Sequence, residues 1–497
     1  MNKHIKKFFE YTKKNHLGIT FGDVLLVPKK SDILPSEVNL ETRVSRNTKL
    51  NIPVISADMS TVTEGTLARE LAKKGGIGFI WKCPDLEKQL GFVDEVKYAF
   101  NAKIDNPVTI NENQTIGDYK EIIKRFKDRF SSLVVLDNEN KVVGLLGRHE
   151  VRFPHKDSDL VKNHMNKDIL KHEGSLDLNE AYNFMGKNRI SKLVLINRNG
   201  ELNGLYSWDE VRSIIENKNP MYNLDEKGRL IVGANVGIHD YKRAEALLNR
   251  GCDVLVVGTA HGHTKNVIET VRELKRTFRD YKFDVVAGNL ISEEGAKDLI
   301  KAGADALKVG IGPSGICTTR IVTGAGFPQL SAIYYVSKIA EKYDIPVIGD
   351  GGIEYSGDIT KALAAGASSV MMGGLFAQTQ ESAGERVIRD GKIFKEYYGM
   401  GSERAMNMDG SKERYRVSGK SVSEGIESNV PLSKTVDEMV NDLIGGVKHG
   451  MGYVGAKDIK TLHEEQAEFI RMTNAGYRES HIHGVLMTKE QSNYAPK

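Results

Sequence analysis

The chain has 497 residues, of which 40% are hydrophobic and 27% are charged, and its formal net charge is +4. This composition is typical of a globular protein with a sizeable core, and the length allows one large domain with an insert or two to three domains. So small a net charge argues against a protein that binds nucleic acid or a membrane surface.

The cysteines and the N-terminal residues bear on where the protein works. Cys83, Cys252 and Cys317 are widely spaced and fit no disulfide or zinc-binding pattern, which indicates a reducing compartment. The N-terminal residues are charged but lack the apolar stretch of a signal peptide, and no run of eighteen apolar residues occurs in the chain. We therefore expect a cytoplasmic protein.

Eight short apolar runs rich in Val, Ile and Gly recur along the chain, and most of them precede a helix-like stretch. Continuous apolar strands that alternate with amphipathic helices indicate parallel β-strands buried on both faces. Eight such units predict a (β/α)₈ TIM barrel, although a doubly wound sheet can use the same units. The eight runs are residues 53–57, 76–81, 231–236, 253–258, 284–288, 306–310, 346–349 and 369–373.

The segment between the second and third runs is too long for one crossover, and it contains an internal repeat. Residues 133–136 (LVVL) recur as residues 193–196 (LVLI), and residues 150–152 (EVR) recur as residues 210–212. The copies are 60 residues apart, so we expect two α/β units that stack on one another. The predicted division is a catalytic barrel over residues 1–105 and 219–497 and an inserted domain over residues 106–218.

A glycine-rich loop that contains one cysteine follows the sixth apolar run. Residues 310–320 read GIGPSGICTTR. Small residues let backbone N–H and C=O groups face a ligand, and a thiol in such a loop is placed to act as a nucleophile. Cys317 is therefore a candidate catalytic residue, against the alternative of a buried structural cysteine.

Two more glycine-rich loops follow the seventh and eighth runs. In barrel enzymes the active site lies in the loops after the strands, and phosphate groups often bind after strands seven and eight. The glycines of residues 349–352 and of Gly373-Gly374 let backbone N–H groups approach a phosphate, and Asp350 can accept hydrogen bonds from two ribose hydroxyls. Together with Cys317, these loops predict a nucleotide monophosphate as the substrate.

Residues 397–430 are polar and show no clear periodicity, and so long an irregular segment is usually functional or mobile. We expect a mobile flap that excludes water from the site after the substrate binds, against the alternative of a disordered surface excursion. Arg414, Tyr415 and Glu424 lie within this segment. They are candidate proton-transfer residues, because activation of a water molecule needs a positioned base.

These motifs resemble those of the IMP dehydrogenase/GMP reductase family over nearly the whole chain. The matching segments are residues 20–28 (TFGDVLLVP), 312–320, 350–353 (DGGI), 397–402 (YYGMGS), 424–426 (EGI) and 479–481 (ESH). The inserted repeat resembles the CBS pair (Bateman domain) of most IMP dehydrogenases. Where CBS repeats commonly have a nucleotide-contacting Thr and Asp, this chain has Gly147 and Glu150, then Ser207 and Glu210, which leaves regulation by nucleotides open.

The resemblance implies a reaction. The Cys317 thiolate attacks C2 of the purine of IMP while a hydride leaves C2 for NAD⁺, and the covalent thioimidate on Cys317 is then hydrolysed to XMP. In the dehydrogenases an Arg-Tyr pair on the flap activates water, and Arg414 and Tyr415 stand at those positions. Thr319 and Glu424 are implied as a second proton route.

The resemblance also assigns residues to ligands. The residues implied in substrate binding are Met59, Ser314, Gly315, Asp350, Gly351, Gly352, Gly373, Gly374, Tyr397, Gly399, Met400 and Gly401. The residues implied in cofactor binding are Gly258, Thr259, Ala260, Asn289, Gly310 and Gly312. The residues implied in binding a monovalent cation such as K⁺ are Gly312, Ser314 and Cys317, with Glu479, Ser480 and His481 of the partner subunit. A site shared in this way implies a homotetramer or an octamer.

The sequence departs from the family pattern at the predicted site. Gly258 stands where the family usually has an Asp that contacts the cofactor ribose, and loss of that acceptor would weaken or alter NAD binding. The common Gly-Ser before Ile-Cys is inverted to Ser314-Gly315. Ser60 replaces a usual Asp, and Gly374 stands where dehydrogenases often have Ser.

Two alternatives stay open. A GMP reductase converts GMP to IMP and ammonia with NADPH, and such enzymes are similar to this chain at Gly373-Gly374 and at residues 328–331. The Arg414-Tyr415 pair favours the dehydrogenase, because reductases have no water to activate. The other alternative is a nucleotide-sensing or scaffold protein without turnover, against which the presence of Cys317 argues.

Overall fold

The computed structural model describes residues 1–100, 102–105, 107–125, 132–408, 422–485, 487–488 and 494. The chain divides into two compact units. Unit 1 comprises Met1–Val96, Met221–Asn223 and Ile231–Lys497, and unit 2 comprises Lys97–Pro220 and Leu224–Leu230. Within the described ranges, no helix is both long enough and apolar enough to cross a membrane.

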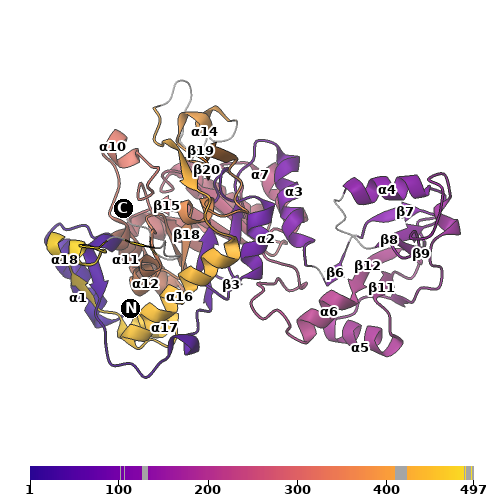
Figure 1. Cartoon of the computed structure of the whole chain (residues 1–497), viewed down its shortest axis with the longest axis horizontal. Helices are drawn as coiled ribbons and strands as arrows, with labels where there is room; N and C mark the ends of the chain where they lie inside the picture. Colours follow the sequence, from indigo (N-terminus) through magenta and orange to yellow (C-terminus); the bar gives the residue numbers. More distant parts are fainter. Residues whose placement is uncertain are drawn as a thin grey trace. The chain divides into compact units, whose positions relative to one another are not determined.

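Unit 1 is built around a closed barrel of eight parallel strands in the order β13-β14-β15-β16-β17-β18-β4-β5 (Figure 1). Each strand falls on one of the eight apolar runs, so the predicted TIM barrel is confirmed. The strands are β4 (Val54–Ser56), β5 (Ile77–Ile80), β13 (Gly233–Asn235), β14 (Val254–Gly258), β15 (Asp284–Leu290), β16 (Ala306–Val309), β17 (Val347–Asp350) and β18 (Ser369–Met372).

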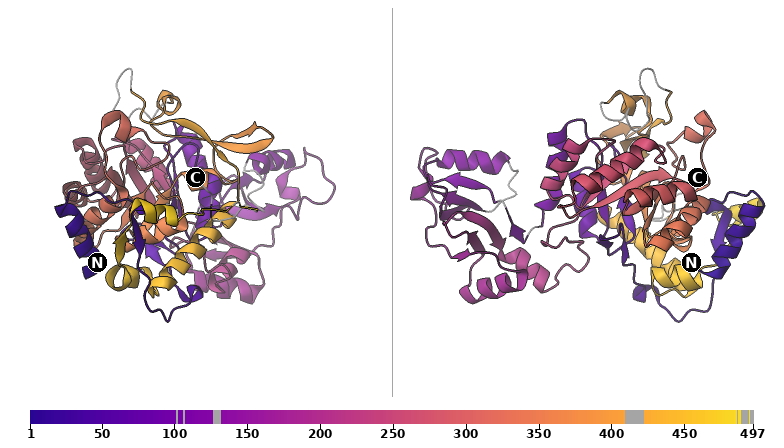
Figure 2. Two further views of the ribbon diagram at one scale, coloured as in Figure 1. Left: turned by 60° about the vertical axis from the view of Figure 1, so that its left-hand side comes forward. Right: turned by 180° about the vertical axis from the view of Figure 1, so that it is seen from behind.

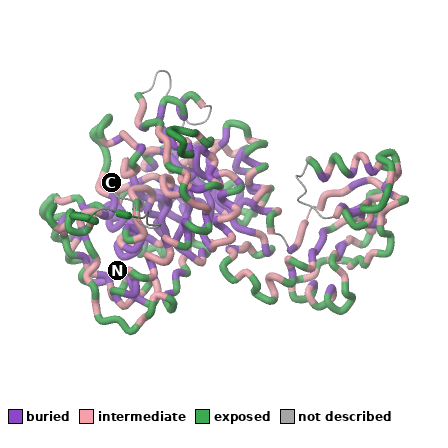
Figure 3. Tube along the Cα trace, in the orientation of Figure 1, coloured by how far each residue is buried: buried purple, intermediate pink, exposed green. Residues whose placement is uncertain are grey.

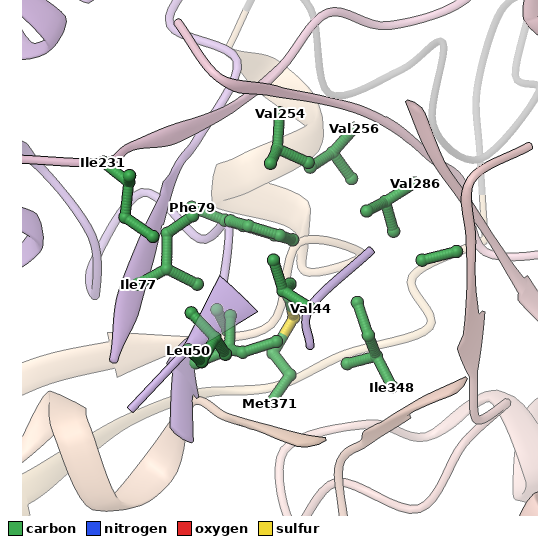
Figure 4. Packing of buried hydrophobic residues seen from close by; sticks show 13 residues of the cluster. Val44, Leu50, Ile77, Phe79, Ile231, Val254, Val256, Val286, Ile348 and Met371 are labelled. Atoms are coloured by element: carbon green, nitrogen blue, oxygen red, sulfur yellow. The ribbon is translucent and has the colours of Figure 1, made fainter. Parts of the chain in front are cut away.

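The barrel interior is a packed apolar core. Phe79, Val254, Ile348 and Met371 belong to one buried cluster, and Figure 4 shows their side chains converging on the same interior. A Cβ atom at position 233 would overlap the Phe79 ring, so the glycine makes room for the large side chain. A short hairpin of β2 (Thr42–Arg43) and β3 (Lys49–Leu50) adds Leu50 to the same cluster. The core thus keeps ligands at the ends of the strands.

Helices surround the barrel, as the two views of Figure 2 show. The predicted helical stretches 264–278 and 293–303 correspond to α8 and α9. Ser292 Oγ accepts a hydrogen bond from the Gly295 amide and caps α9, which stops at Gly303 with a φ of +106°. The surrounding helices are α2 (Gly65–Lys73), α3 (Leu86–Lys97), α7 (Tyr241–Asn249), α8 (Lys265–Thr277), α9 (Glu293–Ala302), α11 (Gln329–Ala340), α12 (Ser356–Ala364) and α16 (Val436–Val454).

Further elements of unit 1 lie outside the barrel. Strands β19, β20 and β21 form an antiparallel sheet, and the predicted flap over residues 397–430 starts at the end of β20 and runs into β21. The remaining α-helices and strands described in this unit are α1 (Lys3–Lys14), β1 (Val24–Leu26), α10 (Thr319–Thr323), α13 (Gly374–Ala377), β19 (Arg386–Arg389), β20 (Lys392–Tyr398), α14 (Glu403–Asn407), β21 (Glu427–Pro431), α17 (Ile459–Thr461), β22 (Phe469–Arg471) and α18 (Asn474–Glu479). Figure 3 shows that burial is concentrated in the barrel strands.

Unit 2 contains the internal repeat as two similar halves, and the insert predicted over residues 106–218 lies within its bounds. In the first half β8 pairs with β9, in the second β11 pairs with β12, and both pairs shift register at equivalent positions. Val134 and Val142 of one half pack with Val194 and Leu205 of the other. The elements are β6 (Lys103–Ile104), β7 (Thr109–Asn111), α4 (Ile116–Arg125), β8 (Ser132–Leu136), β9 (Val142–Gly147), β10 (Lys171–Glu173), α5 (Leu178–Asn188), β11 (Lys192–Ile196), β12 (Leu202–Ser207) and α6 (Trp208–Ile215).

Candidate active site at the carboxyl ends of the barrel strands

A pocket opens at the carboxyl ends of the barrel strands. It contains about 730 Å³ of empty space, with open solvent at its mouth included, which is the size of a small-molecule site. Most of its lining residues lie at or just beyond the carboxyl ends of five barrel strands. The predicted flap contributes three further residues. They are Ala57, Asp58, Met59, Thr259, Ala260, Asn289, Gly310, Ile311, Gly312, Pro313, Ser314, Ile316, Cys317, Thr319, Asp350, Gly351, Gly399, Met400 and Glu424.

The cysteine loop leaves β16 through two glycines in conformations that side chains disfavour. Gly310 has a φ of +146°, and a Cβ atom there would overlap the Asp350 carbonyl. The Arg320 side chain fastens the loop by donating hydrogen bonds to the carbonyls of Ile311 (3.1 Å) and Phe327. The Cys317 amide donates to the Ser314 carbonyl at 3.0 Å, which turns the thiol into the pocket.

A chain of polar side chains starts at the thiol. Cys317 Sγ lies 3.1 Å from Thr319 Oγ1, which donates a 2.8 Å hydrogen bond to Glu424 Oε2. The main chain holds the two segments together, because the Thr318 amide donates to the Glu424 carbonyl at 2.9 Å. Cys317 and Gly425 also form an antiparallel bridge. The arrangement can move a proton between the thiol and the carboxylate by way of the Thr319 hydroxyl.

Two carboxylates that lie near one buried ammonium form the floor of the pocket. Lys308 Nζ, with 1% of its side chain exposed, lies 2.6 Å from Asp350 Oδ2 and 3.7 Å from Asp58 Oδ1. Asn289 Nδ2 donates to Asp350 at 2.8 Å, and Asn235 Nδ2 donates to Asp58. We call these five residues the floor cluster. Charges this deeply buried are tolerated because each one is paired and hydrogen-bonded.

Tyr397 lies against Gly373, directly after the eighth strand. Burial raises the pKa of Tyr397 to about 12, with a side-chain hydrogen bond to Ser314 acting in the opposite direction, so the phenol keeps its proton at neutral pH. A Cβ atom at Gly373 would lie 2.8 Å from Tyr397 Oη and 3.1 Å from Met59 Sδ. The glycine is therefore required by this close approach.

The structure brings most of the predicted residues together. Cys317, Thr319 and Glu424 line the pocket, as do most of the residues predicted for substrate and cofactor. Arg414 and Tyr415 lie outside the described residues. The predicted residues that do not line the pocket are Gly258, Gly315, Gly352, Gly373, Gly374, Tyr397, Gly401, Glu479, Ser480 and His481.

Glu479, Ser480 and His481 lie at the end of α18 and just after it. Ser480 Oγ donates to the Gly476 carbonyl at 2.9 Å, and His481 Nδ1 lies 2.9 Å from the Tyr477 carbonyl. Within this chain these three residues do not line the pocket. They are expected to contribute to the cation site of a partner subunit.

Sequence reasoning missed three members of the floor cluster, which are Asp58, Asn235 and Lys308. Lys308 could have been recognised from the sequence, because it is a charged residue inside the apolar run of residues 306–310. Such a residue in a strand buried on both faces needs a partner. Asp58 and Asn235 had no such signal, since a polar residue at the end of a strand is common.

A family model for the IMP dehydrogenase / GMP reductase domain matches residues 18–483. Three curated relatives named inosine-5′-monophosphate dehydrogenase also match. The protein from Aquifex aeolicus is 46% identical over 494 residues, covering 98% of this chain and 99% of that protein. Those from Helicobacter pylori and Bacillus subtilis are 45% and 44% identical, and each match covers 96% of this chain and 98% of the relative.

Solved structures of a reductase are also similar to this chain. A cysteine-to-alanine variant of GMP reductase from Trypanosoma brucei, in complex with guanosine 5′-monophosphate, has a TM-score of 0.85 and 38% identity. The match covers 94% of this chain and 98% of that chain. GMP reductase of the same organism in complex with guanosine 5′-triphosphate has a TM-score of 0.76 and 35% identity, with 92% and 98% of the two chains covered.

Proposed function

This chain belongs to the IMP dehydrogenase / GMP reductase family, and we propose that it oxidises IMP to XMP with NAD⁺ through a covalent bond to Cys317. The observation that carries this proposal is the chain of contacts from Cys317 through Thr319 to Glu424 inside one pocket. A nucleophile needs a proton acceptor within reach, and Thr319 and Glu424 supply one. The dehydrogenase names of relatives that match nearly the whole chain support the same reaction.

The binding residues divide between the two ends of the substrate. We assign the phosphate to the backbone N–H groups around Gly352 and Gly373, with the protonated Tyr397. Asp350 fits the ribose hydroxyls, because its carboxylate accepts hydrogen bonds and Lys308 and Asn289 fix its position. The purine C2 would then lie near Cys317.

The covalent step forms a bond between Cys317 Sγ and C2 of the purine, and the thiol proton leaves by way of Thr319. NAD⁺, when bound, accepts the hydride that C2 loses. In the second step a water oxygen adds to C2, the C2–S bond breaks, and the thiolate regains a proton. Glu424, through Thr319, is placed to take the proton from that water. We assign Arg414 and Tyr415 to the same water-activating step on the family resemblance.

The residues present fit NAD⁺ and K⁺. Asn289 Oδ1 is buried and has no hydrogen-bond partner within the described part of the chain, and Thr259 and Ala260 line the same wall. A nicotinamide carboxamide can supply the missing donor. Ser314 and Cys317 are the two ends of one turn, and Gly312 lies two residues before it. The backbone carbonyls of such a loop are hard oxygen ligands that suit an alkali cation. Glu479, Ser480 and His481 of the partner subunit would complete that cation site. A site shared in this way requires an oligomer, and we propose a homotetramer or an octamer.

The test of the function compares two reactions in K⁺ buffer. One cuvette contains IMP and NAD⁺, the other GMP and NADPH, and nicotinamide absorbance is followed in both. We expect absorbance to rise only in the first. A fall only in the second would establish a GMP reductase, which the similarity to the Trypanosoma brucei structure supports as the second candidate. No change in either would favour a protein without turnover.

Replacing Glu424 with glutamine should slow steady-state NADH formation about 100-fold, because the amide accepts no proton from Thr319. The initial burst of NADH should keep its full amplitude, since hydride transfer precedes hydrolysis. It should form more slowly than in wild type, because the Cys317 thiol loses the same proton acceptor. Rapid-mixing absorbance measures both phases. Glu427→Gln, an exposed carboxylate three residues away, is the control and should behave as wild type. An unchanged steady-state rate in E424Q would remove Glu424 from the proton route.

We propose that unit 2 is a regulatory CBS pair. The residues at its candidate nucleotide positions make hydrogen bonds to other residues of unit 2. The Gly147 amide donates to the Glu150 carboxylate at 2.9 Å, and Lys192 Nζ donates to the Ser207 hydroxyl at 2.7 Å. Deleting residues 106–218 should leave kcat within about twofold of wild type, because a separately folded unit supplies no pocket residue. Loss of activity by a folded, correctly assembled deletion variant would contradict this separation.

A cytoplasmic location stays a prediction.

A further inference from the structure

The charged residues that line the pocket within the described part of the chain all have the same sign. Among the described residues that line the pocket, the ionisable carboxylates are Asp58, Asp350 and Glu424, and no Lys, Arg or His lies among them. Lys308 stands behind two of these carboxylates, and Arg320 is engaged with two backbone carbonyls of its own loop. The wall therefore presents net negative charge to a bound ligand.

Asp58 adds a carboxylate that no pattern in the sequence predicts. Only 1% of Asp58 is exposed, and it is held by a hydrogen bond from Asn235 and by the nearby Lys308 ammonium. A Cβ atom at Gly258 would lie 3.2 Å from Asp58 Oδ2 and 3.0 Å from Asn235 Nδ2. The Asp58 carboxylate thus lies in close contact with position 258.

The floor cluster carries a surplus charge. In their ordinary ionised forms Asp58, Asp350 and Lys308 sum to −1, and the two asparagine amides neutralise none of it. Thr259 and Ala260 line the same pocket, and the backbone amide of Asn289, a member of the floor cluster, donates to the Thr259 carbonyl at 3.0 Å. A cationic ring seated there would be attracted by the floor, and a neutral ring of the same shape would not.

We propose that Asp58 is a specificity-determining residue that makes this pocket bind the oxidised nicotinamide ring more tightly than the reduced ring. The oxidised ring carries a positive charge and the reduced ring is neutral. The inference rests on the proposed function, since it assumes a nicotinamide beside Cys317. Its consequence is that the reduced cofactor is bound more weakly than the oxidised one, which favours its departure before hydrolysis.

The test measures equilibrium binding in a protein that cannot react. In the Cys317→Ala background with saturating IMP, isothermal titration calorimetry gives the Kd of NAD⁺ and of NADH. We expect NAD⁺ to bind more tightly than NADH. Adding Asp58→Asn, which keeps the side-chain shape and an acceptor for Asn235, should weaken NAD⁺ about tenfold and NADH less than about twofold.

Two further variants separate charge from structure. Asp58→Ala combined with Gly258→Asp moves the carboxylate to the neighbouring position and should restore most of the preference for NAD⁺. Asp284→Asn removes a buried carboxylate at the start of β15, where it accepts from Ser45 and Asn47, and should leave the preference unchanged. If circular dichroism shows that D58N is not folded, the test relies on the Asp58→Ala, Gly258→Asp variant and on the ratio of the Kd values of NADH and NAD⁺ for the protein with Asp58 unchanged.

The outcomes distinguish this inference from the function on which it rests. Equal weakening of NAD⁺ and NADH by D58N would reduce Asp58 to a structural role and overturn the inference. A wild-type protein that binds NADH as tightly as NAD⁺ would overturn it as well. A protein that oxidises no IMP but shows the expected preference and its loss in D58N would support the inference while contradicting the dehydrogenase.

Discussion

Cys317→Ala is expected to lower NADH formation from IMP and NAD⁺ by at least about 10⁴-fold, to the background of the assay. In the proposed mechanism the Cys317 thiol, which lines the pocket, forms the bond to C2, and alanine removes this nucleophile without adding bulk. Steady-state absorbance measures the loss. Calorimetry should show IMP binding retained, because the groups that fit the phosphate and ribose belong to other residues.

Cys252→Ala is the matched control for that variant. It makes the same chemical change at a buried cysteine just before β14, where the thiol donates to the Val232 carbonyl away from the pocket lining. Its kcat should stay close to that of wild type. Turnover near the wild-type rate in Cys317→Ala would refute covalent catalysis by Cys317. Mass spectrometry of acid-quenched wild-type protein should in turn show a nucleotide adduct on Cys317.

Lys308→Met is expected to lower the stability of the barrel by about 3–5 kcal/mol. Methionine fills similar space, but it leaves the buried carboxylate of Asp58 and the partly buried carboxylate of Asp350 without their ammonium partner. Breaking a buried ion pair by removing one partner strands a charge that the interior solvates poorly. The urea-induced unfolding transition of the barrel measures the loss.

The two tryptophans allow that transition to be followed separately from unit 2. Trp81 lies in unit 1 and Trp208 in unit 2, so a Trp208→Phe background leaves fluorescence that reports on the barrel alone. Lys265→Met is the control, because the Lys265 side chain is 84% exposed and its pair with Glu269 is 3.7 Å long. It should change stability by less than about 0.5 kcal/mol. An equally small effect of Lys308→Met would mean that the floor cluster is not held by this ammonium.

Most of the fold could be predicted from local sequence patterns. The eight apolar runs became the eight barrel strands because continuous Val, Ile and Gly segments suit strands buried on both faces. The repeat in residues 133–136 and 193–196 was readable for the same reason, since each copy forms the same strand pair. The choice between a barrel and a doubly wound sheet was not, because closure depends on the pairing of β5 with β13 across the insert.

The sequence by itself determined the barrel strands and the cysteine loop, because both are encoded in contiguous residues. Only the tertiary structure decided what faces Cys317. Closure of the barrel brings Asp58, Asn235, Lys308 and Asp350 from four strands into one cluster, and these positions are far apart in the chain. Their pairing depends on distances that no local pattern contains. From the sequence alone, Gly258 indicates that the carboxylate usual at that position in the family is lost. In three dimensions the Asp58 carboxylate lies beside position 258.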